Sequence, residues 1–376
     1  LIMLVGIFML VLIQFSSTGV LSFDYQDLLG VNLGQYEYAI MLCFFIGFAV
    51  KLPVFPLHGW LPDAHAQAPT AGSVDLAGIL IKTAAFGLLR FVLPLFPNAS
   101  AEFAPIAIVL GLIGVFYGAF LAFAQTDIKR LLAYTSISHM GFVILAIYAG
   151  SLVSLQGLMV QMLAHGLSSA ALFIMAGQVY ERLHTRDMSL MGGMWGQFRY
   201  LPAFLMFFSA ALLGIPSTGN FVGEILIVLG SFAKYPMFTI IAAASFVFAG
   251  LYALIMIYQT LFGKNTSQEV AKAYGGRLRD LSKRELSLLS TLAIGLLWMG
   301  LYPQPILNAS NQAMGFIGAA YHQKIAPSAP IYGRQIIDMQ GVIDELSQKA
   351  NRQDGQLYEY PASELDKQTS QFGQGE

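Results

Sequence analysis

The chain has 376 residues, of which 56% are hydrophobic and only 11% charged, and its formal net charge is −1. Soluble globular domains carry about 25% charged residues, so this composition excludes an ordinary soluble protein and favours helices embedded in a bilayer. The near-neutral charge gives no basic surface for nucleic acid. The one cysteine, Cys43, excludes an intrachain disulfide and a cysteine cluster for zinc or iron–sulfur.

About nine apolar stretches have the length that a bilayer crossing requires. They lie at 1–15, 37–55, 73–96, 101–124, 131–149, 152–179, 200–232, 237–262 and 285–303. The sequence therefore predicts an all-α polytopic membrane protein whose transmembrane domain covers residues 1–303. The first stretch begins at Leu1 inside an apolar run, with no initiator Met or charged flank, so we expect an N-terminally truncated chain whose first span is partial.

Basic residues are unevenly divided between the connections. The connections 57–72, 125–130, 180–199 and 263–284 hold eleven Lys and Arg, whereas the alternate connections hold only Lys234. This bias predicts that the first set is cytoplasmic and that the C-terminal tail is periplasmic. The tail, residues 304–376, is polar, and we expect it to be largely disordered apart from one amphipathic helix in IIDMQGVIDELSQKA.

Three charges fall inside the apolar stretches, where a charge costs several kcal/mol, roughly 3 or more. Lys51 in GFAVKLPVFPLHGW and Glu224 in LGIPSTGNFVGEIL each accompany prolines, which interrupt a helix at membrane depth. Lys82 lies about a third of the way along an apolar helix. Buried charge beside a broken helix indicates an ion pathway.

Each charge also has a purely structural interpretation. Lys51 lies near the end of its span, where a lysine can extend its ammonium to the interface. Glu224 could be paired with a neighbouring Ser or Asn, although this is costly in lipid. Lys82 requires either a counter-charge or a neutral amine, and in both states it can carry a proton.

Two histidines occupy consecutive spans, and both lie beside hydroxyl side chains. His139 lies in AYTSISHMGF and His165 in VQMLAHGLSSAALF. A single helical histidine is usually a packing residue, but a pair with hydroxyl neighbours favours a proton relay, because neutral imidazole both donates and accepts. No carboxylate or cysteine stands at ligand spacing, which argues against a metal.

An accessory set lies in the cytoplasmic connections. His58, Asp63 and His65 fall in the Pro-rich segment PLHGWLPDAHAQAPTAGS, and Lys129 follows in the next connection. The segment is expected to cap and orient the helix that begins near Thr70, and a role in proton uptake remains open.

Three long runs then carry a resemblance to a known family. The runs KLPVFPLHGWLPDAHAQAPTAGSVDLAGILIKTAAFGLLRF, FAQTDIKRLLAYTSISHMGF and LGIPSTGNFVGE resemble the antiporter-like membrane subunits of proton-pumping NADH:quinone oxidoreductase, respiratory complex I. The resemblance covers about residues 1–310. It implies two inverted five-helix repeats, each with one broken helix, and glutamate at Glu224 resembles the M-type subunits, since the other antiporter-like subunits carry lysine there.

The resemblance also assigns roles. It implies that Lys51 is the lysine of the first broken helix, Lys82 the bridging lysine, His139 and His165 the connecting relay, and Glu224 the terminal carboxylate. The carboxylate that pairs with the first of these lysines in the family would precede Leu1. The polar tail departs from the family, whose members end soon after the last helix.

The resemblance implies partners as well: other membrane and peripheral subunits of complex I, neighbouring antiporter-like subunits among them. Flavin, iron–sulfur clusters, NADH and quinone would bind those partners, and no cofactor is expected in this chain. Redox energy released there would drive protons along the chain of Lys, His and Glu. Two alternatives stay open: a subunit of a multisubunit sodium/proton antiporter, and a structural scaffold whose charges only fix helix packing.

Overall fold

The computed structural model describes residues 1–262, 266–273 and 279–322, and within them the regular structure is helical. Among the described residues, six spans are long and apolar enough to cross a membrane: Thr70–Leu95, Pro97–Phe123 (α8), Ile128–Ala149 (α9), Leu152–Leu183 (α10), Pro236–Leu261 (α13) and Lys283–Leu301 (α15). Shorter apolar helices are Ile2–Thr18 (α1), Leu201–Leu212 (α11) and Gly219–Phe232 (α12). With α3 (Glu37–Lys51), every predicted span contains a helix. The all-α membrane fold is confirmed.

Two predicted spans are broken, as their prolines indicate. α3 ends at Lys51, and the chain resumes as the short helix α4 (Trp60–Gln67), which lies in the Pro-rich connection. The second break separates α11 from α12, and Gly214 within it has a left-handed φ of 77°. The sequence placed residues 57–72 in a polar, Pro-rich connection, and residues 60–67 of it form a helix, because helix formation resumes after the proline pair.

The span that carries Lys82 is distorted twice. It consists of α5 (Thr70–Asp75), a π-helical turn η2 (Leu76–Leu80), α6 (Ile81–Gly87), a second π-helical turn η3 (Leu88–Val92) and α7 (Leu93–Leu95). π-helical turns inside α-helices occur often at functional sites. The first of them directly precedes Lys82.

Helix α9 forms the centre of the bundle and α15 lies at its edge, with 94% and 17% of their spans buried. Glycines allow the central helices to approach closely. A side chain on Gly141 of α9 would collide with the carbonyl of Gly111 in α8, and one on Gly157 of α10 would lie 2.7 Å from the Ile227 nitrogen of α12. These contacts hold α9 against α8 and α10 against α12 at membrane depth.

Helix α15 also touches the second break, although most of it is exposed. A side chain on Gly300 would collide with the Ser217 carbonyl, and one on Gly219 would approach the Met299 Cβ to 2.9 Å. The last span therefore packs directly against the irregular turn between α11 and α12.

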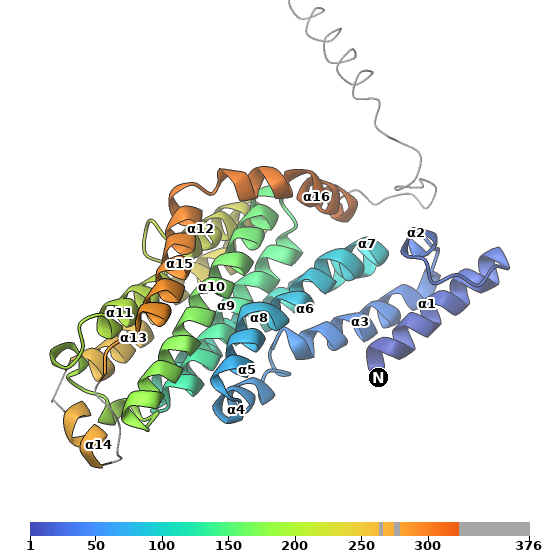
Figure 1. Ribbon diagram of the computed structural model, residues 1–376. Helices are drawn as coiled ribbons and strands as arrows, with labels where there is room; N and C mark the ends of the chain where they lie inside the picture. The colour runs from blue at the N-terminus through green and yellow to red at the C-terminus, as the bar shows by residue number, and fades with distance from the viewer. Residues whose placement is uncertain (263–265, 274–278, 323–376) are drawn as a thin grey trace, which may run out of the picture. The chain divides into compact units, whose positions relative to one another are not determined.

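After α15 the chain forms another helix, α16 (Gln304–His322), which runs across the ends of the bundle helices (Figure 1). Its buried residues Ser310, Met314 and Tyr321 lie on one face, as expected for a surface helix. The expectation of a largely disordered tail was thus wrong for residues 304–322, which form a helix because their 3.6-residue periodicity gives it a face to bury. The remainder of the predicted tail, including IIDMQGVIDELSQKA, lies outside the described residues.

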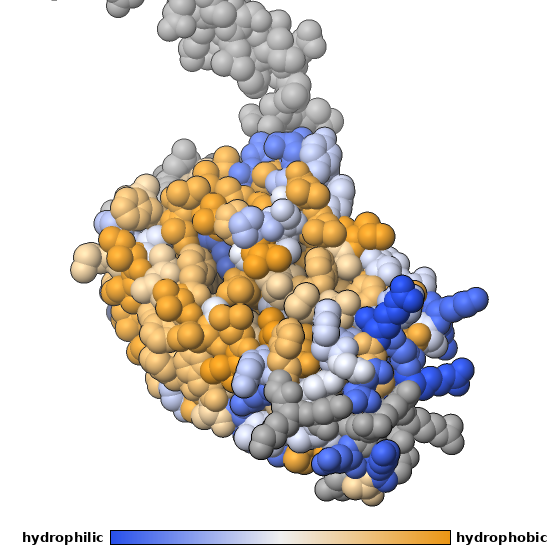
Figure 2. Space-filling view, turned by 90° about the vertical axis from the view of Figure 1, so that its left-hand side faces the viewer, coloured by the Kyte–Doolittle hydropathy of each residue, from blue (hydrophilic) through white to orange (hydrophobic). Residues whose placement is uncertain are grey.

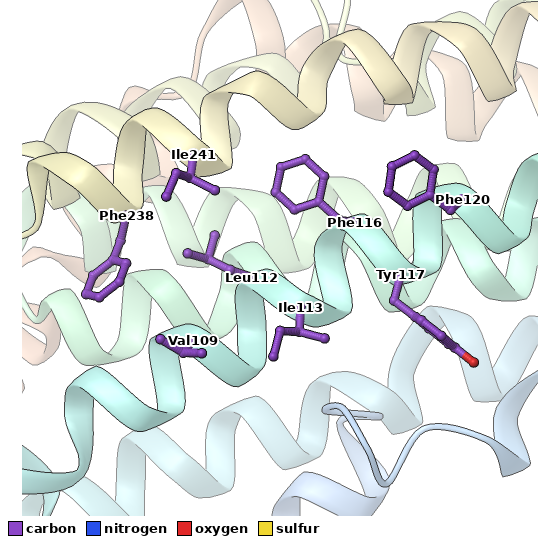
Figure 3. A pocket seen from close by; sticks show the side chains of 8 residues that line it. All are labelled: Val109, Leu112, Ile113, Phe116, Tyr117, Phe120, Phe238 and Ile241. Carbon is purple, nitrogen blue, oxygen red and sulfur yellow. The ribbon is translucent and has the colours of Figure 1, made fainter.

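On the face shown in Figure 2, hydrophobic side chains cover most of the surface, and hydrophilic side chains gather at its top and lower right. Two short helices, α2 (Tyr25–Leu28) and α14 (Ser267–Ala273), lie outside the spans. A shallow groove of about 470 Å³ between α8 and α13 is lined entirely by apolar or aromatic side chains, among them Phe116, Phe120 and Phe238 (Figure 3). This groove has the character of a lipid-facing surface.

Candidate functional site

Lys82, which is half-buried, begins a line of ionisable groups whose other members are buried. Its ammonium donates to the carbonyl of Ala77, inside η2, and lies 2.9 Å from Nδ1 of His165 on α10. The Ser169 hydroxyl donates to the same carbonyl over 3.4 Å. A protonated lysine is only a donor, so His165 Nδ1 accepts in this contact whenever Lys82 carries its proton.

The two histidines lie next to each other in the interior. His165 is fully buried and His139 is 3% exposed, and their ring centroids are 5.2 Å apart at an interplanar angle of 59°. The sequence predicted both residues, but not that their rings would be neighbours.

Glu224 lies beyond His139. Its carboxylate is 3.1 Å from His139 Nδ1, and its Oε1 accepts a hydrogen bond of 3.2 Å from the Gln161 side-chain amide. The contact with His139 has the distance of an ion pair, but not the alignment of a hydrogen bond. Glu224 is only 4% exposed, so its charge is held inside the protein by neighbours on α9 and α10.

The spatial order is therefore Lys82, His165, His139, Glu224. In this order His165 comes before His139, although it follows His139 in the sequence. This arrangement brings together four of the five predicted relay residues. It joins the distorted helix η2–α6 to the helix after the second break.

Tyr252 on α13 was missed by sequence reasoning. Its hydroxyl lies 3.3 Å from Nε2 of His139, on the side of the ring opposite Glu224, and the residue is fully buried. A tyrosine in an apolar helix carries no local signal that distinguishes it from a packing residue.

Gln161 and Asn220 complete the polar interior. The Asn220 amide donates to the Ser168 hydroxyl over 3.1 Å, and both side chains are fully buried. Gln161, His165 and Ser168 recur at intervals of four and three residues along α10, a periodicity that identifies one helix face. That spacing could have marked Gln161 as part of the site.

Four buried atoms in this region find no hydrogen-bond partner among the described residues: His139 Nδ1, His165 Nε2, Gln161 Oε1 and Asn220 Oδ1. Buried polar atoms are nearly always hydrogen-bonded, to protein or to ordered water. A polar interior with several such atoms meets the requirement for bound water, which is two to four polar partners.

Lys51 lies apart from this line. It is the last residue of α3, it is exposed, and the described part of the chain supplies no hydrogen bond or ion pair to its ammonium. A cation is favourable there, because the C-terminal end of a helix carries partial negative charge.

The accessory residues hold the first broken helix in place. Asp63 forms an ion pair with Arg130 at 2.6 Å, and the Lys129 ammonium donates to the Ala68 carbonyl over 2.9 Å, at the end of α4. His65 is fully buried and stacks on Phe173, with ring centroids 4.4 Å apart.

His58, the remaining accessory residue, packs between Phe55 and Tyr117. These four residues therefore have structural contacts of their own and lie outside the Lys82–Glu224 line. No group of three or more His, Cys, Asp or Glu residues that could hold a metal ion occurs in the described ranges.

A separate cluster fixes the start of α11. The Asp280 carboxylate accepts backbone hydrogen bonds from Arg199, Tyr200 and Leu201 at 2.8, 2.9 and 3.2 Å. Burial alone raises the pKa of Asp280, but the backbone donors outweigh it and hold that pKa below its ordinary value. The first half of the second broken helix is thus capped from another part of the chain.

Comparison with known proteins agrees with this architecture. Residues 1–256 match the family model described as NADH:quinone oxidoreductase/Mrp antiporter, TM. The chain belongs to this family. NADH:quinone oxidoreductase/Mrp antiporter members similar to it include NADH-quinone oxidoreductase subunit M of Escherichia coli K12, 56% identical over 88% of this chain and 64% of that protein. The Pseudomonas aeruginosa subunit M is 60% identical over 84% of the chain and 60% of that protein.

The chain thus spans slightly less than two thirds of these relatives. Among solved structures, respiratory complex I from Thermus thermophilus with bound NADH matches with a TM-score of 0.75 and 29% identity, over 85% of this chain and 67% of that one. The Mrp complex from Dietzia sp. DQ12-45-1b has a TM-score of 0.72 at 18% identity, over 88% and 67%, and shares the fold.

Proposed function

We propose that the chain is a proton-translocating subunit of the membrane arm of NADH:quinone oxidoreductase, of the subunit M type, in a bacterial inner membrane. The observation that carries the proposal is the line from Lys82 through His165 and His139 to Glu224. Isolated charges are costly in a bilayer, and a connected series of titratable groups at membrane depth is typical of proton relays.

The proton would move in steps that the geometry permits. Lys82 passes a proton to His165 Nδ1 across 2.9 Å, and His165 releases its other ring proton toward His139 through bound water. His139 takes up a proton at Nε2 and gives the one on Nδ1 to the Glu224 carboxylate, 3.1 Å away. The result is a neutral lysine, two neutral imidazoles and a protonated glutamic acid.

The driving force would come from outside this chain. Flavin, iron–sulfur clusters, NADH and quinone belong to partner subunits in this proposal, and neighbouring antiporter-like subunits transmit the change through the membrane arm. Lys51 would receive that signal at the first broken helix, because it is the charged group closest to that break. A change in its charge pairing would alter the field at Lys82 and shift the proton toward the histidines.

Glu224 provides the most direct test, because it is the acceptor at the end of the line. We expect Glu224→Gln to abolish most proton pumping by the assembled complex in inverted membrane vesicles, and Glu224→Asp to retain part of it. Glu102→Gln, on the exposed face of α8, is the matched control and should pump normally. Equal behaviour of the Gln and Asp variants would make Glu224 structural.

The second candidate is a subunit of a multisubunit sodium/proton antiporter, which the Mrp likeness in fold supports. The much higher identity to subunit M favours the oxidoreductase. Purification with flavin and iron–sulfur proteins would identify the oxidoreductase, and a complex without them the antiporter. A scaffold role would stand only if removing the buried charges left pumping intact.

A further inference from the structure

The face of α10 that carries His165 and Gln161 continues toward the end of the molecule at which α9 and α12 terminate. Ser154 and Ser151 extend the same three- and four-residue spacing as Gln161, with one exception at Leu158. Ser154 is fully buried, whereas Ser151, at the start of α10, is partly exposed. Polar residues on this face of α10 thus run from the relay to the surface, and Leu158 is the one apolar residue among them.

Helix α12 presents a matching line. Glu224 is followed by Ile227 and then by Ser231 at intervals of three and four residues, so all three lie on one face. Ser231 is fully buried, and its hydroxyl finds no hydrogen-bond partner among the described residues. A buried orphan hydroxyl so close to the exit of a relay indicates a position where a water molecule or a passing proton carrier is bound.

The two faces are in direct contact. A side chain on Gly157 would lie 2.7 Å from the Ile227 nitrogen, and one on Gly223 would lie 2.7 Å from the Gln161 Cα. Further along, the Ser151 hydroxyl donates to the Gly230 carbonyl over 2.8 Å. The polar residues of α10 and α12 therefore share one seam, defined here by Ser151, Ser154, Glu224 and Ser231.

One apolar layer interrupts this seam. Leu158 and Ile227 are both fully buried and belong to the same hydrophobic cluster. They occupy about one helical turn, roughly 5.4 Å, between the Glu224–Gln161 pair and the two serines. Water and protons cross a dry apolar layer poorly, because nothing in it replaces their hydrogen bonds.

We propose that the α10–α12 seam is the release path for the proton on Glu224, and that Leu158 and Ile227 form a closed hydrophobic gate across it. The inference rests on the proposed function, since it takes Glu224 as the end of the relay. In the orientation expected from the basic residues, the seam opens on the outer side. The gate prevents outside protons from running back to Glu224 when the subunit is at rest.

The test measures passive proton leak, which needs no redox turnover. The intact complex is reconstituted into liposomes with a trapped pH dye, and proton influx is driven by a potassium diffusion potential without NADH. Ile227→Ser makes the seam continuously polar. We expect at least a ~tenfold rise in proton conductance, equivalent to about 1.4 kcal/mol off the barrier.

Matched variants identify the route. Leu158→Ser should leak in the same way from the α10 side, and Ile225→Ser, on another face of α12, should stay tight. Adding Glu224→Gln to Ile227→Ser should abolish the leak. Tight vesicles from both assembled gate variants would overturn the gate, and a leak that persists with Glu224→Gln would overturn the path.

Either failure would be distinct from failure of the proposed function, which is measured by redox-driven pumping of Glu224→Gln in the otherwise native chain. A tight Ile227→Ser complex alongside an inactive Glu224→Gln complex removes only the gate. Normal pumping by Glu224→Gln removes the relay and the release path together.

Discussion

The two broken helices are both interrupted beside proline, but they carry opposite charges in opposite places. In the first, Lys51 is the last residue before the break, and in the second, Glu224 lies in the second turn after it. The C-terminal end of a helix carries partial negative charge and the N-terminal end partial positive charge. Lys51 thus lies at a helix end that suits a cation, whereas Glu224 lies beyond the first turn of α12, to which the helix-end effect is confined.

The surroundings of the two charged residues differ as well. Lys51 is exposed, whereas Glu224 is buried against His139 and Gln161. A proline-containing break determines where backbone groups lose their helical hydrogen bonds. The helices packed around the break determine whether the charged side chain is buried and which groups it contacts. The chemistry of such a motif is therefore decided by tertiary contacts.

After replacement of Glu224, replacement of Lys51 has the largest expected effect on proton pumping. It tests whether the exposed charge at the first break is needed as much as the buried charge at the second. We expect Lys51→Ala to remove most pumping and quinone-linked NADH oxidation while the complex still assembles. Lys51→Arg should rescue only partly, because guanidinium does not release a proton. Lys283→Ala, at an exposed position at the start of α15, is the control. Normal pumping by assembled Lys51→Ala would make this lysine an interfacial anchor.

Replacing the two histidines tests whether protons reach Glu224, after the second break, through imidazole side chains. His139→Ala and His165→Ala should each lower pumping, and the double variant should be no worse than the worse single one, as expected for links in series. Proton uptake by vesicles, normalised to assembled complex, measures this. An undiminished double variant would leave water alone as the connection between Lys82 and Glu224.

Tyr252→Phe should have an intermediate effect. The change keeps the aromatic ring and removes only the hydroxyl that lies 3.3 Å from His139 Nε2. Loss of one hydrogen bond is worth about 1 kcal/mol, so we expect pumping to fall about two- to tenfold. Tyr148→Phe is the matched control, because the Tyr148 hydroxyl is buried without a hydrogen-bond partner among the described residues. Equal activity of the two variants would remove Tyr252 from the site.

Replacing Asp280 has the smallest expected effect, which is a loss of stability at the start of α11 and not a loss of pumping. Asp280→Ala should lower stability by about 1 kcal/mol through loss of the helix cap, measured as thermal unfolding of the intact complex. The folded-state pKa is lowered, so the stabilisation is present above the ordinary pKa and is lost as pH falls through the folded value. Asp280→Asn should not lose stability in that acid range, and a native-like acid dependence in this variant would contradict the assignment.

The sequence predicted the spans, the breaks and four members of the Lys82–Glu224 line, because apolar length, proline and intramembrane charge are local signals. It did not predict that His165 lies between Lys82 and His139. It also did not predict that Tyr252 contacts His139 and that Gln161 contacts Glu224. Those facts depend on contacts between α9, α10, α12 and α13, which no local pattern encodes. Helices α4 and α16 were missed for another reason: both are short or amphipathic, and an apolar window overlooks them.

The contact of Gly300 with the Ser217 carbonyl has a consequence for biogenesis. Helix α15 is synthesised more than fifty residues after α12 ends, yet its backbone packs against the turn that separates α11 from α12. Until the ribosome has delivered this last span and the bilayer has accepted it, the turn lacks the surface that shapes it. The turn of the second break is therefore expected to reach its final shape only after α15 has inserted.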